Sequence, residues 1–311
     1  MQRQLFYGFS FLILLSGVLF SCDKNEEFES EEEAQQNFVL QGTGTLVFND
    51  YQPFSDKAIN LYYHVPESAN KTSPILMVFH GASRDAVESR DELIKKADFY
   101  NTILVVPEFS NASFPGSDTY NLGNVFVDGD NPSPQTLNPE TEWTFSVIEP
   151  IYDYIKGLTA NQNNTYRAFG FSAGAQFLHR FLLFKPNAKV GRVVVASAGW
   201  YSIPDLQIDF PYGIQKTPIQ SSSLGTFFSR DLTVLVGEAD NDPNAPSLRR
   251  NSSADQQGTN RLARAQYFFN QSSSLASQSG ISFQWNYKSI PNARHNFKQV
   301  GEYAFDNILS Q

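Results

Sequence analysis

Residues 166–184 read YRAFGFSAGAQFLHRFLLF and carry the clearest structural signal in the chain. The first six positions are mostly aromatic, apolar or small, which predicts a buried strand. The last twelve predict a helix, which ends before Lys185-Pro186 because proline cannot continue a helix. Ser172 lies between them, with Gly170 and Gly174 two positions away on either side. These glycines allow a very tight turn that holds the serine in a strained, exposed position.

Strands and helices alternate on both sides of this segment. The expected strands cover residues 59–65, 75–79, 103–106, 166–171, 193–196, 232–236 and 283–287. The expected helices cover 88–97, 140–158, 173–184, 260–270 and 297–309, with a kink or an earlier break as the alternative at Pro150. Strands separated by helices predict a mostly parallel sheet. The expected fold class is therefore α/β, a mostly parallel central sheet flanked by helices, in one domain over residues 41–311.

Two long stretches, over residues 109–139 and 200–230, interrupt the alternation. Both are loop-like in composition, and the second carries several aromatic residues, among them Trp200 and Tyr212. Loops of this length are usually functional or disordered. We expect these two to pack over the top of the sheet, where they either line a substrate cleft or simply cover the core.

The first residues have the pattern of an export signal. Arg3 is followed by a nearly continuous apolar run over residues 5–20, too short to favour a membrane-spanning helix and typical of a secretory signal. The ending Leu19-Phe20-Ser21-Cys22 resembles the bacterial lipoprotein signal. That resemblance implies that residues 1–21 are removed and that Cys22, the only cysteine, is lipidated. An ordinary cleaved signal with an incidental cysteine is the alternative.

Residues 22–40 are expected to form an acidic, flexible tether. Seven acids and one lysine lie within residues 22–33, so this stretch has a net charge of −6. A segment with so few apolar residues cannot bury enough surface to fold. An acidic stretch after a lipidated cysteine is similar to the surface-export signal of some Gram-negative lipoproteins, and a plain solvated linker is the alternative. We therefore expect a membrane partner through a lipid anchor in the outer membrane, with or without exposure at the cell surface.

The composition of the whole chain excludes several classes of protein. Its 311 residues include 23 Lys and Arg against 32 Asp and Glu, a net charge of −9. A nucleic-acid partner is not expected, because neutralising phosphates requires a surplus of cations. One cysteine cannot form an intrachain disulfide or a cysteine-rich metal site. No metal or organic cofactor is expected.

The Gly-x-Ser-x-Gly turn, placed between a strand and a helix, resembles the nucleophile turn of the α/β-hydrolase family. The resemblance implies that Ser172 is the catalytic nucleophile. The family has an oxyanion loop after its third strand, and His80-Gly81-Ala82-Ser83 follows residues 75–79 here. Backbone N–H groups of Ala173 and Ala82 are therefore expected to form the oxyanion hole, and His80 is expected to brace the loop.

The family's order of serine, acid and histidine suggests the catalytic base. His64 precedes Ser172, and His179 lies on the helix that follows it. His295 alone lies after the last expected strand and before the final helix. His295 is therefore the expected base, with a surface-loop histidine as the alternative.

The acid of the family follows the strand expected at 232–236. Asp240 matches the Gly-x-x-Asp spacing found in many esterases of the family and is the favoured acid, and Asp242 is the alternative acid. Weaker candidates are Glu238, Asp205 and Asp209.

By its general layout the chain looks most like feruloyl esterases and polyhydroxyalkanoate depolymerases. This resemblance implies a serine-dependent hydrolase of carboxylic esters that works through an acyl-serine intermediate on a small-molecule or polymeric ester. Two other classes stay open: a lipase or peptidase on the same scaffold, and a non-catalytic surface-binding lipoprotein. Residues 114–124 and 257–261 look like loops specific to a family, without an assigned role.

Overall fold

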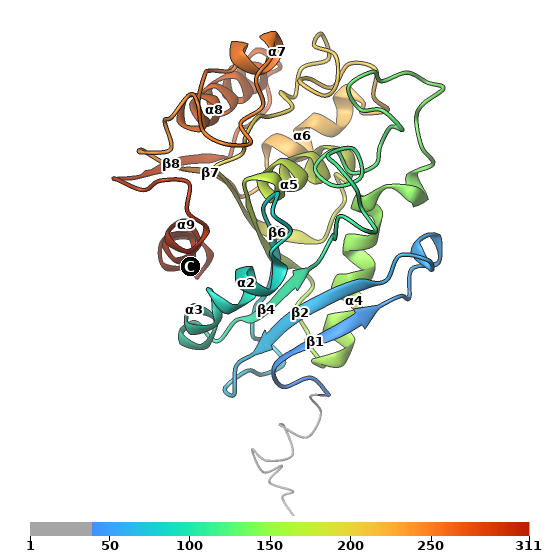
Figure 1. Cartoon of the computed structure of the whole chain (residues 1–311), viewed down its shortest axis with the longest axis vertical. Helices are drawn as coiled ribbons and strands as arrows, with labels where there is room; N and C mark the ends of the chain where they lie inside the picture. Colours follow the sequence, from blue (N-terminus) through green and yellow to red (C-terminus); the bar gives the residue numbers. More distant parts are fainter. Residues whose placement is uncertain (1–38, 311) are drawn as a thin grey trace, which may run out of the picture.

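The computed structural model describes residues 39–310, which form one eight-stranded sheet with helices on both faces (Figure 1). The expectations for the signal at residues 1–21, for Cys22 and for most of the tether lie outside the described residues. The strands are β1(Gly42–Phe48), β2(Ile59–Val65), β3(Ile75–Phe79), β4(Ile103–Pro107), β5(Tyr166–Phe171), β6(Val190–Ala196), β7(Leu232–Gly237) and β8(Asn286–Ile290).

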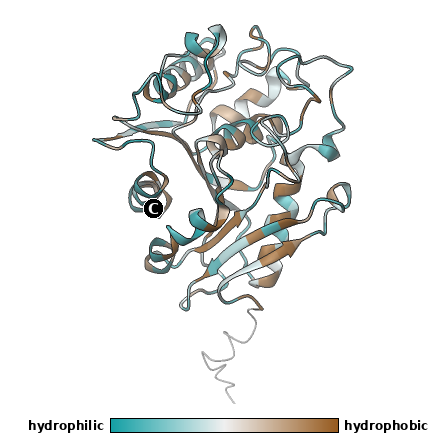
Figure 2. Ribbon diagram, in the orientation of Figure 1, coloured by the Kyte–Doolittle hydropathy of each residue, from teal (hydrophilic) through white to brown (hydrophobic). Residues whose placement is uncertain are grey.

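The strands lie in the order β1-β2-β4-β3-β5-β6-β7-β8 across the sheet. The pairs from β4 through β8 are all parallel, whereas β1 pairs antiparallel with β2 and β2 antiparallel with β4. β3, β4 and β7 are buried along their whole length, and the middle of the sheet is its most hydrophobic part (Figure 2). Helices shield a parallel sheet on both faces, which explains these continuous apolar runs. The predicted α/β class is confirmed.

The helices are α2(Ala86–Asp91), α3(Ile94–Phe99), α4(Ile148–Leu158), α5(Ala173–Phe184), α6(Leu224–Phe228), α7(Ser252–Gln256), α8(Arg261–Gln278) and α9(Phe297–Ala304). α2, α3 and α9 pack on one face of the sheet, and α4, α5, α6 and α8 pack on the other (Figure 1). Among the described residues, no helix combines the length and the apolar character needed to cross a bilayer.

The last strand differs from the prediction. The strand expected at 283–287 begins and ends three residues later in the structure, where β8 covers Asn286–Ile290. The aromatic residues that suggested the earlier start serve another purpose. Trp285 is buried, its ring meets the Phe227 ring edge-on, and its indole N–H donates to the Phe227 carbonyl at 3.0 Å. These residues join α6 to the sheet before the strand begins.

Three expected helices also differ, and one of them, expected at 260–270, continues to Gln278 as α8. Residues 88–97 do not form one helix, since α2 and α3 are separate and meet at Glu92-Leu93. The helix expected at 140–158 begins only at Ile148, after two short 3₁₀ turns. Pro150 therefore lies in the first turn of α4, where a missing N–H removes no helical hydrogen bond.

Candidate active site

Ser172 lies on the sharp turn from β5 into α5. Its backbone has φ 55° and ψ −112°, a strained conformation for a residue with a side chain. A Cβ atom at Gly170 would collide with the Gly174 carbonyl, and one at Gly174 would collide with the Phe79 carbonyl. Both glycines are thus required for the close approach of β5, α5 and β3. The turn predicted from the Gly-x-Ser-x-Gly pattern is present.

Two side chains join Ser172 in a continuous series of hydrogen bonds. His295 Nε2 lies 3.1 Å from Ser172 Oγ, and His295 Nδ1 lies 2.8 Å from Asp240 Oδ2. Asp240 is 4% exposed, so its carboxylate is largely shielded from water. The Phe171 ring stacks on the imidazole with 4.6 Å between centroids, which restricts how the ring can turn. The structure thus brings together the three residues that the sequence analysis favoured.

Backbone contacts hold the loops that carry the acid and the histidine side by side. Ala239 N donates to the Ala293 carbonyl at 2.9 Å, and Glu238 N donates to the Ile290 carbonyl at 3.0 Å. A Cβ atom at Gly237 would collide with the same Ala293 carbonyl. Glycine at this position therefore lets the loop after β7 lie directly against the loop after β8.

A buried arginine forms an ion pair with the carboxylate of Asp240. Arg261 Nη1, at the start of α8, lies 3.5 Å from Asp240 Oδ1, and the two side chains are 2% and 4% exposed. Burial lowers the pKa of Arg261, while the Asp240 charge acts in the opposite direction. Arg261 belongs to the segment 257–261, for which the sequence alone predicts no role. A single sequence gave no signal for this pair, because the two residues meet only through the packing of α8.

The other acids considered lie elsewhere. Asp242 is exposed, and its carboxylate accepts a hydrogen bond from Asn244 N at 2.8 Å within a local turn. The Glu238 carboxylate accepts from the Ser289 hydroxyl. Asp205 caps its own turn at Gln207 N, and Asp209 pairs with Lys216 at 2.7 Å. None of these carboxylates forms a hydrogen bond with His295 in the described part of the chain.

The two other histidines that were considered as bases serve different contacts. His64 lies between the Asp98 carboxylate and the Thr43 hydroxyl, at 2.6 and 2.7 Å, on the antiparallel side of the sheet. His179 is fully buried; one ring nitrogen contacts the Ala175 carbonyl, and the other accepts from Ser202 N. Burial lowers the pKa of His179 well below its usual value, so the ring stays neutral.

The loop after β3 lies against the nucleophile turn. The Cβ position of Gly81 is 3.9 Å from Ser172 Cβ, and Ala82 lines the same cleft as Ser172. Ala173 is the first residue of α5, so its N–H has no acceptor within the helix. The loop therefore lies beside Ser172, and the oxyanion hole formed by Ala173 and Ala82 stays a prediction.

His80 holds this loop in place. Its Nδ1 donates to the Gly81 carbonyl at 3.0 Å, and its Nε2 accepts from Phe109 N at 3.1 Å. The Tyr120 hydroxyl donates to the His80 carbonyl at 2.8 Å. Burial lowers the pKa of His80 to about 4, which keeps the ring neutral and able to accept.

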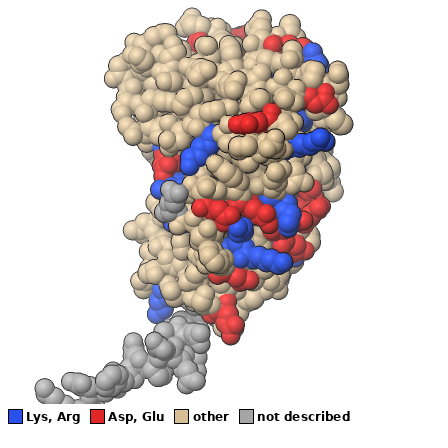
Figure 3. Space-filling model, turned by 90° about the vertical axis from the view of Figure 1, so that its left-hand side faces the viewer, with Lys and Arg blue, Asp and Glu red and all other residues tan. Residues whose placement is uncertain are grey.

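Ser172 and His295 open into a cleft of about 390 Å³. Asp85, Glu88 and Glu92 line this cleft with one cation, Lys298, which pairs with Glu92. Acidic and basic side chains gather on this face of the molecule, over α2, α3 and α9 (Figure 3). Among the described residues, no group of three histidine, cysteine or acidic side chains is arranged to hold a metal ion.

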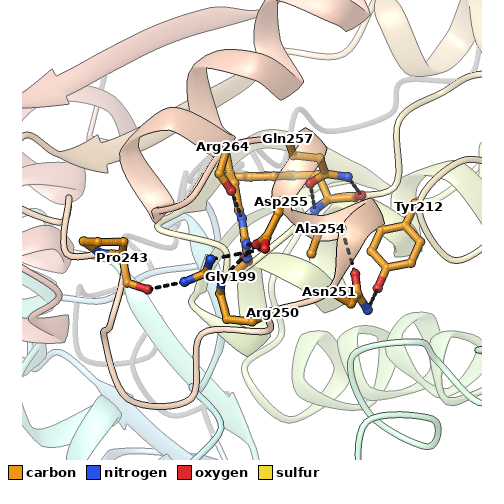
Figure 4. Close-up of polar contacts among 11 residues, drawn as sticks. Gly199, Tyr212, Pro243, Arg250, Asn251, Ala254, Asp255, Gln257 and Arg264 are labelled. Carbon is orange, nitrogen blue, oxygen red and sulfur yellow. Dashed lines mark hydrogen bonds and ion pairs between the residues drawn. The ribbon is translucent and has the colours of Figure 1, made fainter.

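Ser247, in the segment between Asp240 and α8, lines one side of the cleft. A network of polar contacts holds this segment in place (Figure 4). Asp255 pairs with Arg250 at 2.8 Å and with Arg264 at 3.0 Å. Gln257 makes two hydrogen bonds with the backbone of Tyr201, at 2.9 and 2.7 Å. The network therefore ties this segment to the loop after β6.

Comparison with solved structures identifies similar enzymes. Poly(aspartic acid) hydrolase-1 from Sphingomonas sp. KT-1 shares 35% sequence identity at a TM-score of 0.82, over 87% of this chain and 99% of that one. LpqC, a poly(3-hydroxybutyrate) depolymerase from Bordetella parapertussis, shares 26% identity at a TM-score of 0.80, over 86% and 89% of the two chains. An S-formylglutathione hydrolase from Agrobacterium tumefaciens shares the fold, with 12% identity and a TM-score of 0.54, over 86% and 92%. Models of protein families and curated protein sequences give no match to this chain.

Proposed function

The chain belongs to the α/β-hydrolase family, as the sequence resemblance indicated, and on that premise we propose that it hydrolyses carboxylic esters through an acyl-serine intermediate at Ser172. The observation that carries the proposal is the series of hydrogen bonds from Ser172 through His295 to the buried Asp240, at the edge of an open cleft. A serine hydroxyl needs such a base before it can attack a carbonyl carbon.

The geometry supports a two-stage reaction. As Ser172 Oγ attacks the ester carbonyl, His295 Nε2 takes the hydroxyl proton and then donates it to the departing alcohol. A water molecule then attacks the acyl-serine, giving one proton to His295, and the carboxylic acid leaves as Ser172 regains its proton. Asp240 holds the imidazole in the required tautomer and stabilises its protonated form. The N–H groups of Ala173 and Ala82 stabilise the negative charge on the carbonyl oxygen.

The charge of the cleft favours an uncharged ester over a polyanion. Asp85 and Glu88 line the cleft, and Lys298, the one lysine among the described residues that line it, is already paired with Glu92. A polymer of carboxylates such as poly(aspartic acid) would be repelled by these side chains. We therefore propose a small or polymeric neutral ester, as in the poly(3-hydroxybutyrate) depolymerase, as the substrate class. Comparing p-nitrophenyl butyrate with the p-nitroanilide of the same acid distinguishes an esterase from a peptidase-like enzyme, because the two uncharged substrates differ only in the ester or amide bond.

Replacing the nucleophile tests the proposal. Ser172→Ala should reduce hydrolysis of p-nitrophenyl butyrate by about 10³-fold or more and should abolish labelling by a fluorophosphonate probe, because no oxygen remains to be acylated. The melting temperature should change little, since the substitution removes one partly exposed hydroxyl group.

Ser229→Ala, at the end of α6 and far along the chain from the turn, is the matched control and should keep both activities. Ester turnover that survives in Ser172→Ala would refute the mechanism. A wild-type protein that neither turns over esters nor reacts with the probe would instead indicate a non-catalytic binding protein.

A further inference from the structure

A second cavity, larger than the catalytic cleft, lies outside the machinery described above. Its volume is about 750 Å³, within the range of small-molecule sites, and Ser172 and His295 do not line it. The loop over residues 203–216, the tip of the loop near Asp130, and α7 and α8 form its walls. We refer to this cavity as the α7 groove.

The charges in the α7 groove are already neutralised. Asp209 pairs with Lys216 at 2.7 Å, both on the loop that forms one wall. Asp130 pairs with Arg249, whose guanidinium lies over the rings of Trp200 and Tyr212. Among the described residues, the charged side chains that line the groove are therefore paired, and none of them is left to attract an ion of opposite charge.

Side-chain amides remain free to bind an uncharged ligand. Gln207, Gln215 and Gln256 line the groove and are exposed, and no other described residue forms a hydrogen bond with their amide groups. Each amide presents a donor and an acceptor close together. Neighbouring hydroxyl groups on a sugar ring present the same pair, because each hydroxyl can both donate and accept.

The groove also offers an aromatic surface that is held in place. The half-buried Tyr212 ring packs against Trp200 with 5.0 Å between centroids, and its hydroxyl accepts from Asn251 Nδ2 at 2.6 Å (Figure 4). Tyr267 of α8 also lines the groove. Fixed aromatic rings pack against the apolar faces of flat ligands with little loss of conformational freedom.

We propose that the α7 groove binds a neutral oligosaccharide. A peptide fits less well, because three of the apolar lining side chains, Ile203, Phe210 and Pro211, are buried, and Ile208 is the one large apolar side chain of the described lining that is exposed. The groove and the cleft share one connecting segment: Ser247 lines the cleft, and Arg249 and Asn251 contact groove residues. The two sites are therefore joined through the backbone of this segment.

Isothermal titration of the full-length protein with neutral tetrasaccharides (cello-, xylo-, malto- and mannotetraose) tests the proposal. At least one should bind with a Kd of about 1 mM or tighter. Gln256→Ala, an exposed change on a helix surface, should weaken binding about threefold to tenfold, and Tyr212→Ala should weaken it more. Gln220→Ala, an exposed glutamine outside the groove, is the matched control and should bind as the wild type does.

Each result supports or contradicts binding of an oligosaccharide in the α7 groove, and none of them requires a measurement of catalysis. Failure of all four sugars to bind, or unchanged binding in both Gln256→Ala and Tyr212→Ala, would overturn the proposal. Equal binding of tetra-alanine would overturn the assignment to sugars. Since binding is measured without turnover, these outcomes are independent of whether Ser172 hydrolyses esters.

Discussion

Asp240 and Asp242 are separated by one residue and look alike in the sequence, yet their surroundings differ completely. Asp240 is buried between His295 and Arg261, whereas Asp242 is exposed and caps a turn. The spacing after β7 was enough to favour Asp240. Arg261 could not be predicted, because its contact with Asp240 depends on how α8 packs against the loop after β7.

The two acids give a direct comparison. Asp240→Asn should lower kcat for ester hydrolysis by about 10³-fold or more, because the amide no longer stabilises the protonated imidazole and favours the wrong tautomer. Asp242→Asn should leave kcat within about twofold, since its side chain contacts only a local turn. Steady-state kinetics on the same ester measures both. A greater loss in Asp242→Asn would mean that the loop rearranges and that Asp242 is the acid.

At the scale of elements, the strand–turn–helix around Ser172 could be predicted because its signal is local: apolar residues, two glycines and a helix ended by proline. The first residue of β8 could not be predicted in this way. Phe283 and Trp285 alternate with polar residues as a strand would, but they pack against α6 and α8 before pairing with β7 begins. The break between α2 and α3 could not be predicted either, because no glycine or proline lies there. Tertiary packing decided both boundaries.

The close approach of the loops after β7 and β8 leads to a prediction for Gly237. In Gly237→Ala the added methyl group collides with the Ala293 carbonyl, which forces the acid and the histidine apart. We expect a loss of about 1–3 kcal/mol in the free energy of unfolding and at least a tenfold fall in kcat. Urea unfolding and ester kinetics measure the two effects.

Gly157→Ala is the matched control. Gly157 lies in α4 with no atom within 4 Å of its Cβ position, so alanine there should stabilise the protein by about 0.5–1 kcal/mol. If both variants behave alike, the contact between the two loops does not constrain the site.

For the whole molecule, the α/β class followed from the alternation of apolar runs, but the order of the strands did not. The sequence order of β3 and β4 is reversed in the sheet, and β1 and β2 add an antiparallel edge. Pairing between distant segments depends on the assembled core, which periodicity alone cannot specify. The α7 groove could not be predicted either, because its walls come from segments that are distant in the sequence, between residues 130 and 267.

Buried neutral histidines should make the stability of the whole fold depend on pH. The pKa of His80 is about 4 in the folded protein and about 6.5 when the chain is unfolded, so the unfolded state binds more protons between these values. The stabilising contribution is complete above pH 6.5 and decreases as the pH falls towards 4. We expect the free energy of unfolding to fall by about 2 kcal/mol between pH 7 and pH 5 from His80 alone.

Urea unfolding at pH 7, 6 and 5 measures this slope. His80→Gln lacks the titrating group and should show a shallower dependence, with a remainder from His179, whose pKa is lowered in the same direction. Equal slopes in the wild type and the variant would show that His80 does not carry the effect.

β1 begins at the end of the sheet where the parallel strands have their amino ends. Gly42 pairs with Val65 there, and Val39 N donates to the carbonyl of Leu158 at the end of α4. Ser172, Asp240 and His295 follow the carboxyl ends of β5, β7 and β8, at the opposite end of the sheet. If the protein is immobilised on beads through the side of the molecule where β1 begins, the cleft should therefore face the surrounding solution. Random coupling through surface amines would behave differently, because Lys298 lies at the cleft itself and its attachment would obstruct entry.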